Sequence, residues 1–208
     1  MYDDIISFTV DRPTISKEQK GMDFFSLLLF ESGAGKHTIN GTAYQILPRQ
    51  LHILYPQQLH SWDIHGDVKI HVIFVSWKLF SRFDNYFVFP VEFYKTNSVI
   101  DLTAAGYQGL LNEFIGIRDE VEQRNSLREI VFSKLRIMAL LISREAGTKF
   151  TQINKGTQDM LITRFILFVH ANFRSQRKVS FYAEQLMITS NYLNTICRKF
   201  LGMTATEF

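Results

Sequence analysis

Cysteine is almost absent from this chain, and long apolar runs are absent altogether. The single cysteine, Cys197, cannot form a disulfide within the chain, and no Cys/His spacing typical of a structural zinc site occurs. The N-terminus is acidic where a secretory signal would be basic, and the longest apolar stretch, Phe24 to Phe30, is too short to cross a membrane. These absences predict a cytoplasmic protein with no membrane partner.

Charge is nearly balanced overall but uneven along the chain. Residues 1–148 carry 15 Lys and Arg against 17 Asp and Glu, whereas residues 149–208 carry 8 against 3. The front is therefore −2 and the last stretch +5. A basic segment joined to a neutral body is typical of a module that meets phosphate, although a solvated surface with a chance excess of basic residues gives the same count.

Residues 24–76 have the pattern of short strands separated by turns. The expected strands are 24–31, 37–40, 43–47, 51–55, 60–64 and 68–76. Asn40-Gly41 between two of them predicts a tight hairpin, because both central residues of a type I′ turn need a positive φ. In the last strand Val68, Ile70, Val72 and Phe74 form a fully apolar face, and the opposite face is mixed. Many short strands at this spacing predict a small barrel or sandwich.

Beyond residue 100 the apolar residues recur at helical spacing. Two long amphipathic helices are expected, over residues 103–121 and 126–146. The candidate N-caps are Asp101 or Thr103 for the first helix and Asn125 or Ser126 for the second. Residues 147–156 are polar and lack a period. We therefore predict a first domain over 1–148, a linker over 149–156 and a second domain over 157–208.

The last thirty residues have the pattern of a helix-turn-helix. Ser180 is expected to cap a short helix that ends near Leu186, and Thr189 to cap a second helix that ends at Gly202. In the major groove the second helix would present polar and basic side chains. The candidate DNA-binding residues are Ser190, Asn191, Asn194, Thr195, Arg198 and Lys199. A helical hairpin with a merely solvated polar face is the alternative.

These residues resemble a known family. Ala183, Leu186, Thr189, Tyr192-Leu193, Ile196, Arg198-Lys199, Gly202 and Phe208 are similar to the first helix-turn-helix of AraC/XylS-type transcription regulators. The upstream segment Glu31 to Gly41, with residues 44–54 and 56–60, resembles the cupin-type effector domain that often precedes it. Cys197 departs from the family pattern, which has a large aromatic there. The resemblance also implies that the DNA-binding module continues past Phe208 into a second helix-turn-helix.

The resemblance implies a fold class and an assembly. The fold is expected to be α+β, with an N-terminal cupin-like β-barrel and two long helices, followed by an all-α, incomplete helix-turn-helix module. The two long helices are similar to the pair through which such regulators form homodimers. The expected dimer residues are Leu127, Val131, Leu135 and Met138. A lid on the barrel is the other interpretation of these helices.

Cupins also include metalloenzymes, so the histidines of the strand-rich segment are possible metal ligands, namely His37, His52, His60, His65 and His71. Residue His37 lacks the close His-x-His partner and following Glu of the catalytic motif. We expect no metal, no cofactor and no catalytic residue, and instead a small-molecule cavity, since small barrels commonly hold one ligand. The candidate ligand-binding residues, drawn from the mixed faces, are Phe30, His37, Tyr55, His60, Trp62 and His71. A filled barrel without a ligand is the alternative.

The sequence thus predicts a DNA-binding transcription regulator whose barrel senses an effector or mediates dimerisation. Its expected partners are double-stranded DNA, a small molecule and a second copy of the chain. Two alternatives stay open, a cupin-type metalloenzyme and an effector-binding or dimerisation fragment that does not bind DNA.

Overall fold

The computed structural model describes residues 4–20, 23–89, 91–153 and 157–208. The chain divides into two compact units. The N-terminal unit comprises residues 1–87 and 97–145, and the C-terminal unit comprises residues 88–96 and 146–208. No described helix is both long enough and apolar enough to cross a membrane.

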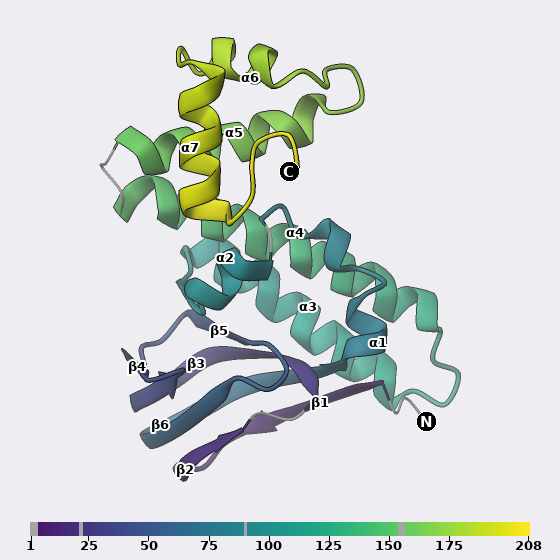
Figure 1. The fold of residues 1–208 in the computed structure, drawn as a ribbon. Helices are drawn as coiled ribbons and strands as arrows, with labels where there is room; N and C mark the ends of the chain where they lie inside the picture. Colours follow the sequence, from purple (N-terminus) through teal and green to yellow (C-terminus); the bar gives the residue numbers. More distant parts are fainter. Residues whose placement is uncertain (1–3, 21–22, 90, 154–156) are drawn as a thin grey trace. The chain divides into compact units, whose positions relative to one another are not determined.

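The N-terminal unit is built on one antiparallel sheet (Figure 1). Its strands are β1 (Ile5–Val10), β2 (Thr14–Lys20), β3 (Phe24–Ile39), β4 (Thr42–Gln45), β5 (Gln50–Leu54), β6 (Leu59–Ser76) and β7 (Val99–Asp101). The main order is β1-β6-β3-β5-β7, while β2 pairs with β6 and β4 pairs with β3. The expectation of a strand-rich N-terminal domain and an α+β fold is confirmed. Strands β1 and β2, which lie before residue 24, were not predicted.

Local turn chemistry explains the hairpin between β3 and β4. Asn40 has φ 48° and Gly41 has φ 79°, which are the two positive values that the predicted turn requires. The flanking residues Ile39 and Thr42 pair directly across the turn. The hairpin prediction is therefore confirmed.

Strands β3 and β6 each continue through a segment that the sequence indicated as a break. The pairing of β3 with β6 shifts register twice between Phe30 and Ala34, as β-bulges do. Gly33 and Gly35 adopt φ values of 127° and 124° there, a region that favours glycine. At Gly35 a Cβ atom would also collide with the backbone carbonyl oxygen of Asp63. The glycines bend two long strands instead of ending four short ones.

The two faces of the sheet have different surroundings. On one face Leu28, Phe30, Val72 and other apolar side chains form a buried core cluster. On the other face the sheet packs against helix α3 (Ala104–Glu122), which contacts β1 and β6. The fully apolar side of β6 therefore faces the buried core cluster, and its mixed side faces α3.

The remaining helices of this unit are short except for α4. They are α1 (Trp77–Phe80), the 3-10 turn η1 (Asp84–Tyr86) and α4 (Arg128–Ile153), whose last residues belong to the C-terminal unit. Thr103 caps α3 as predicted, because its side chain accepts a hydrogen bond from the Gly106 amide. The buried Glu145 carboxylate of α4 accepts hydrogen bonds from the Thr103 amide at 2.8 Å and the Thr103 hydroxyl at 3.2 Å.

The C-terminal unit contains α2 (Val91–Thr96), the end of α4, α5 (Thr157–Asn172), α6 (Val179–Gln185) and α7 (Ser190–Leu201). Its boundary differs from the predicted one. Residues 88–96 join this unit, and residues 149–153 of the predicted linker continue α4 as helix, whereas residues 154–156 of that linker lie outside the described residues.

Candidate functional site

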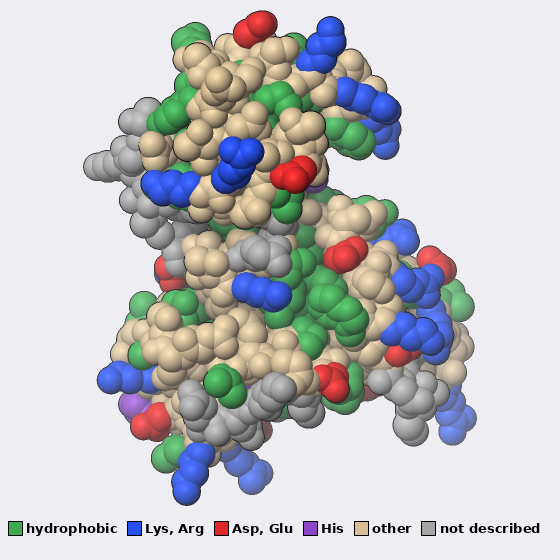
Figure 2. All heavy atoms as spheres, viewed as in Figure 1, with side chains coloured by type: hydrophobic (Ala, Val, Ile, Leu, Met, Phe, Trp, Pro, Cys, Tyr) green, Lys and Arg blue, Asp and Glu red, His purple; other side chains and the backbone are tan. Residues whose placement is uncertain are grey.

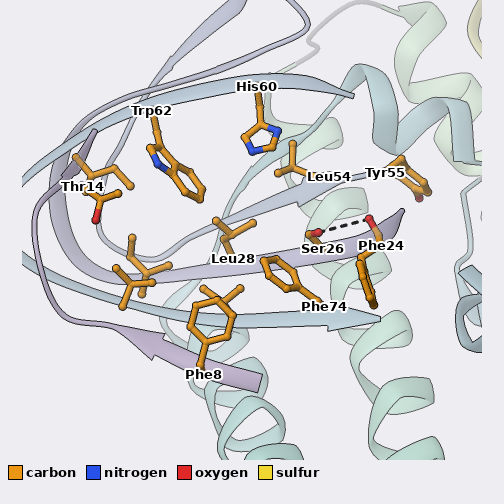
Figure 3. Close-up of a pocket in the computed structure, with 14 residues that line it drawn as sticks. Phe8, Thr14, Phe24, Ser26, Leu28, Leu54, Tyr55, His60, Trp62 and Phe74 are labelled. Atoms are coloured by element: carbon orange, nitrogen blue, oxygen red, sulfur yellow. Dashed lines mark hydrogen bonds between the residues drawn. The ribbon is translucent and has the colours of Figure 1, made fainter. Parts of the chain in front are cut away.

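A cavity of about 320 Å³ lies on the apolar face of the sheet (Figure 3). Strands β1, β2, β3, β5 and β6 all contribute to its wall. The lining residues are Phe8, Val10, Thr14, Phe24, Ser26, Leu28, Leu54, Tyr55, His60, Trp62, Ile64, Ile70, Val72 and Phe74. Apolar walls with a few polar groups are typical of small-molecule sites, and this volume is at the lower end of their usual range.

His60 and Trp62 each bring to the cavity wall a buried polar atom that has no hydrogen-bond partner among the described residues. These atoms are Nδ1 of His60 and Nε1 of Trp62. The two side chains extend from the same face of β6, and their ring centroids are 5.6 Å apart (Figure 3). An indole nitrogen can only donate a hydrogen bond. An unused donor and an unused ring nitrogen are therefore buried in neighbouring side chains of the wall.

Behind these two rings lies His37, which starts a buried chain of hydrogen bonds. Its Nδ1 atom is 2.8 Å from Nδ1 of His52, and Nε2 of His52 is 3.1 Å from Oε1 of Gln50. The same Oε1 accepts a hydrogen bond from the Leu47 amide, and Nε2 of Gln50 donates to Asp101 at 2.7 Å. The cavity end of the sheet is thus connected to β7 through side chains from three strands.

The direction of these hydrogen bonds fixes the tautomers of His37 and His52. Because Oε1 of Gln50 can only accept, Nε2 of His52 donates to it, which leaves Nδ1 of a neutral His52 as an acceptor. Nδ1 of His37 must then donate. Nε2 of a neutral His37 is consequently an acceptor, and this buried atom has no partner among the described residues.

Burial keeps the rings near the cavity neutral. Loss of solvent lowers the pKa of His37 from its ordinary value of 6.5 to about 3, and the neighbouring His60 ring contributes to the same shift. Burial also lowers the pKa of His60, against a hydrogen bond to the Gln58 backbone that raises it. At neutral pH both side chains therefore act as hydrogen-bonding groups without charge.

The structure places the six predicted ligand-binding residues in three surroundings. Tyr55, His60 and Trp62 line the cavity. Phe30 and His37 are fully buried in the same unit but do not line it. His71 does not belong to this site, because it lies on the helix-facing side of β6.

On that side, Nε2 of His71 is 2.9 Å from a carboxylate oxygen of Glu31, and its ring lies beside Phe114 of α3. The hydrogen bond from His71, together with Lys69, holds the pKa of Glu31 below its usual value against the effect of burial. The prediction favoured the mixed faces of the strands, whereas the cavity lies on the apolar face. The eleven lining residues that were missed are mostly apolar, and the apolar side of β6 was the signal that could have identified them.

The histidines do not form a metal centre in the described part of the chain. No group of three or more His, Cys, Asp or Glu side chains there is arranged to hold a metal ion. His52 binds Gln50 and His71 binds Glu31 on opposite faces of the sheet, so the sheet itself separates these imidazoles.

Helices α6 and α7 lie in the segment where the sequence predicts a helix-turn-helix. Thr189 caps α7 by accepting a hydrogen bond from the Tyr192 amide, and Gly202 ends the helix at φ 73°, both as predicted. The turn between the helices contains Met187, which is 94% exposed and has φ 57°. Ser180 is not the N-cap of α6, because the helix begins at Val179 and Lys178 occupies the capping position without a side-chain bond.

The six predicted DNA-binding residues do not all lie on one exposed face. Asn191, Thr195 and Arg198 are exposed and fall on one side of α7, with Ser190 half-buried at its start. Oδ1 of Asn194 instead accepts a hydrogen bond from the Ala205 amide at 2.9 Å, so this side chain is turned toward the following segment. Nζ of Lys199 donates to Oε1 of Gln158 on α5 at 2.9 Å. The Thr195 hydroxyl donates to the Asn191 carbonyl at 3.0 Å, so contacts within the unit engage three of the six side chains.

The four predicted dimer residues are also divided. Val131, Leu135 and Met138 are buried inside the N-terminal unit, with exposures of 3%, 0% and 1%. They stabilise the core and cannot touch a second copy in this conformation. Leu127 is 61% exposed, and further along α4 the exposed apolar side chains are Ile130, Ile137 and Leu140. The sequence pattern indicated an apolar stripe but not which of two adjacent stripes is buried in the unit.

Comparison with known proteins agrees with this architecture. Residues 5–80 match the sequence model of the family described as AraC-like ligand binding domain. A search of curated protein sequences gave no match. Among solved structures, the chain is similar to the AraC-like transcriptional activator CuxR, with 14% identity, coverage of 94% of this chain and 70% of CuxR, and a TM-score of 0.51.

Two further structures are more distant. Unsaturated fatty acid bound wild-type ToxT from Vibrio cholerae strain SCE256 has 10% identity, coverage of 99% of this chain and 94% of ToxT, and a TM-score of 0.41. KdgF from Halomonas sp. has 13% identity, coverage of 35% of this chain and 68% of KdgF, and a TM-score of 0.31. The likeness to CuxR shows a shared fold. Residues 5–80 thus match the sequence model of the AraC-like ligand binding domain family, and the chain shares an α+β fold with CuxR, as its sequence predicted.

Proposed function

We propose that this protein is a ligand-responsive transcription regulator without catalytic activity. Its N-terminal cavity binds a small-molecule effector, and its α6–α7 pair binds double-stranded DNA. The observation that carries the proposal is that every residue that lines the cavity lies within residues 5–80, the segment that matches a ligand-binding family.

Effector binding is tested with naphthalene, an uncharged probe whose size suits the cavity. An engineered cavity of about 150 Å³ holds one benzene ring, so a space of about 320 Å³ suits roughly a dozen non-hydrogen atoms. We expect saturable binding in ligand-observed NMR. Leu28→Trp should fill the cavity and abolish binding, while Leu47→Trp, at a residue that is 50% exposed, should leave it intact. Equal binding by the two variants would contradict the proposed site.

DNA binding is supported by the exposed polar side of α7 and by the basic composition of the last sixty residues. Lys and Arg side chains stand at several places on the C-terminal unit in Figure 2, and acidic ones are few. Asn191 and Thr195 have side chains that can hydrogen-bond base edges, and Arg198 can contact phosphate.

The experiment is fluorescence anisotropy with duplex DNA at two salt concentrations. Removal of one phosphate contact should lower the slope of log K against log salt by about 1. We therefore expect Arg198→Ala to weaken binding to all sequences and to reduce the slope. The matched control is Lys78→Ala, an exposed basic residue of the N-terminal unit, which should leave both unchanged. A chain that responds to naphthalene but never binds DNA would favour the alternative of an effector-binding fragment.

We further propose a homodimer that uses the exposed side of α4 instead of its buried side. Ile130 and Ile137 are seven residues apart and share one side of the helix with Leu140, at exposures of 39%, 44% and 50%. Burial of this stripe against a second copy would remove apolar surface from water. Light scattering should show a dimer for the native chain and a monomer for Ile137→Glu. A dimer that survives this substitution would place the interface elsewhere.

The metalloenzyme alternative has a direct test. Protein purified without chelator should contain far less than one equivalent of iron, manganese or zinc per chain. One equivalent that depends on His37 and His60 would refute the non-catalytic interpretation.

A further inference from the structure

The wall of the cavity has no Lys, Arg, Asp or Glu among its fourteen lining residues, all of which the structure describes. Its two aliphatic hydroxyls are engaged with the backbone, since Thr14 donates to the carbonyl of Arg12 and Ser26 donates to that of Phe24. A charged ligand would lose its hydration here without meeting an opposite charge, which is costly in an apolar site. The wall therefore favours a molecule without charge.

Aromatic rings bound the cavity on two sides. His60 and Trp62 lie near the start of β6, and their ring centroids are 5.6 Å apart. Phe74, near the end of the same strand, packs edge-on against Phe8 of β1 with the centroids 5.4 Å apart. In Figure 3 the first pair lies on one side of Leu28 and the second pair on the other. Because both pairs line the cavity, a ligand within it would have rings on either side.

Several of these rings keep surface that the rest of the unit does not cover. Phe8 is 38% exposed, and Phe24, Trp62 and Phe74 are half-buried, whereas Phe25 of the same unit is fully buried. Nε1 of Trp62 is a buried atom, so carbon makes up all the exposed surface of that side chain. Apolar surface in a hollow is stabilised when a ligand removes it from water, and an aromatic ligand adds stacked or edge-to-face contacts beyond the buried area.

We propose that the cavity binds an uncharged aromatic molecule of about two fused rings, held between the His60–Trp62 pair and the Phe8–Phe74 pair. This inference rests on the proposed effector-binding function of the same cavity and names its ligand class. A saturated ring system would fill the same space but would lack the aromatic contacts. A carboxylate would meet no Lys or Arg in the wall. A cation would be attracted by the ring faces, but no Asp or Glu lines the wall to balance its charge.

The first experiment tests charge by equilibrium dialysis of the full native chain at neutral pH. It uses two pairs of probes that match in shape, 2-acetylnaphthalene with 2-naphthoate, and tert-butylbenzene with phenyltrimethylammonium. We expect the neutral ketone to bind at least about thirtyfold more tightly than the carboxylate. The neutral hydrocarbon should bind about tenfold more tightly than the ammonium ion, because the ring faces offset only part of its lost hydration.

The second experiment tests aromatic character with naphthalene and trans-decalin, which share one carbon skeleton. Each affinity is corrected for the transfer of the probe from water to cyclohexane, since the saturated probe leaves water more readily. The corrected affinities should favour naphthalene about fivefold. Phe74→Leu should bring this ratio close to one and still bind both probes. Phe173→Leu is the matched control, because Phe173 is 52% exposed in the C-terminal unit, and it should keep the native ratio.

The outcomes separate the ligand class from the function of the cavity. If 2-naphthoate or phenyltrimethylammonium binds more tightly than its neutral partner, the ligand is not uncharged. Equal corrected affinities of naphthalene and trans-decalin for the native chain would show that the ligand is not specifically aromatic. Either result overturns this proposal and leaves the effector cavity in place, whereas failure of every probe to bind would overturn both. The native-chain comparisons decide the point even if Phe74→Leu does not fold.

Discussion

The neutral, buried His37 should make the stability of this protein depend on pH in a way that one substitution removes. Its side chain has no exposure to solvent, and burial lowers its pKa from 6.5 to about 3. In the unfolded chain the same side chain takes up a proton near pH 6.5. Between pH 6.5 and 3 the unfolded state therefore binds one proton more than the folded state, so the free energy of unfolding falls as pH falls.

The magnitude follows from the width of that window. Each pH unit below 6.5 costs about 1.4 kcal/mol while the folded ring stays neutral. Lowering the pH from 7.5 to 5 should remove about 2 kcal/mol of stability through His37 alone, a large part of the stability of a typical domain. His60, whose pKa is also lowered, should add to the same trend.

The assay compares the native chain with His37→Asn by urea unfolding, followed by circular dichroism from pH 7.5 to 5. Asparagine retains a hydrogen-bonding group near the position of Nδ1 and does not titrate in this range. The variant should be less stable at pH 7.5, and the difference between the two proteins should shrink by about 2 kcal/mol by pH 5. Leu28→Val is the control for destabilisation alone and should run parallel to the native chain. Parallel curves for native protein and His37→Asn would show that the pKa of His37 is not lowered in the fold, which would refute the inference that the buried ring stays neutral.

Four further substitutions, one of them a matched control, test the fold by unfolding measurements. Gly35→Ala should destabilise the N-terminal unit by about 3 kcal/mol or more, because a collision with the backbone adds to a positive φ, whereas Gly41→Ala, with open space around it, should cost only about 1 kcal/mol; equal costs would contradict the close approach at the bulge. Glu145→Gln should cost about 1 to 2 kcal/mol, since the amide weakens the two hydrogen bonds from Thr103, and an unchanged midpoint would show that the carboxylate does not hold α3. Asn194→Ala should lower the stability of the C-terminal unit by about 1 kcal/mol, because its hydrogen bond from the Ala205 amide is lost. If the substitution weakens DNA binding and leaves stability unchanged, the Asn194 side chain belongs to the DNA-binding face.

The confirmed predictions rest on turn and helix-capping residues, whose effect is local. Asn40-Gly41, Thr103, Thr189 and Gly202 each act through their own backbone or through residues within three positions. Such signals are visible in a short window of sequence, and the hairpin and the three helix ends follow from them. The family resemblance, rather than periodicity, supplied the cupin-like fold of the first unit.

The predictions that failed depend on contacts between distant positions. The orientation of Asn194 is set by the Ala205 amide, eleven residues later, and that of His71 by Glu31, forty residues earlier. A glycine with positive φ can end a strand or bend it, and only the partner strand decides which, as Gly35 against Asp63 shows. Spacing alone likewise could not tell whether Leu135 or Ile137 is buried, since both lie on apolar stripes of the same helix.

The hydrogen-bond chain from His37 to Asp101 explains why the polar end of the cavity needs residues that do not line it. Without Gln50 to accept from His52, either nitrogen of His37 could carry the hydrogen, and Nε2 would have no defined role. Asp101 can only accept, and the Leu47 amide can only donate, so the two ends of the Gln50 amide cannot exchange. The same strand β7 that carries Asp101 leads through Leu102 to Thr103, the cap of α3. Within one unit, the hydrogen-bonded side chains behind the cavity wall are thereby connected through β7 to the first turn of α3. This helix covers the opposite face of the sheet.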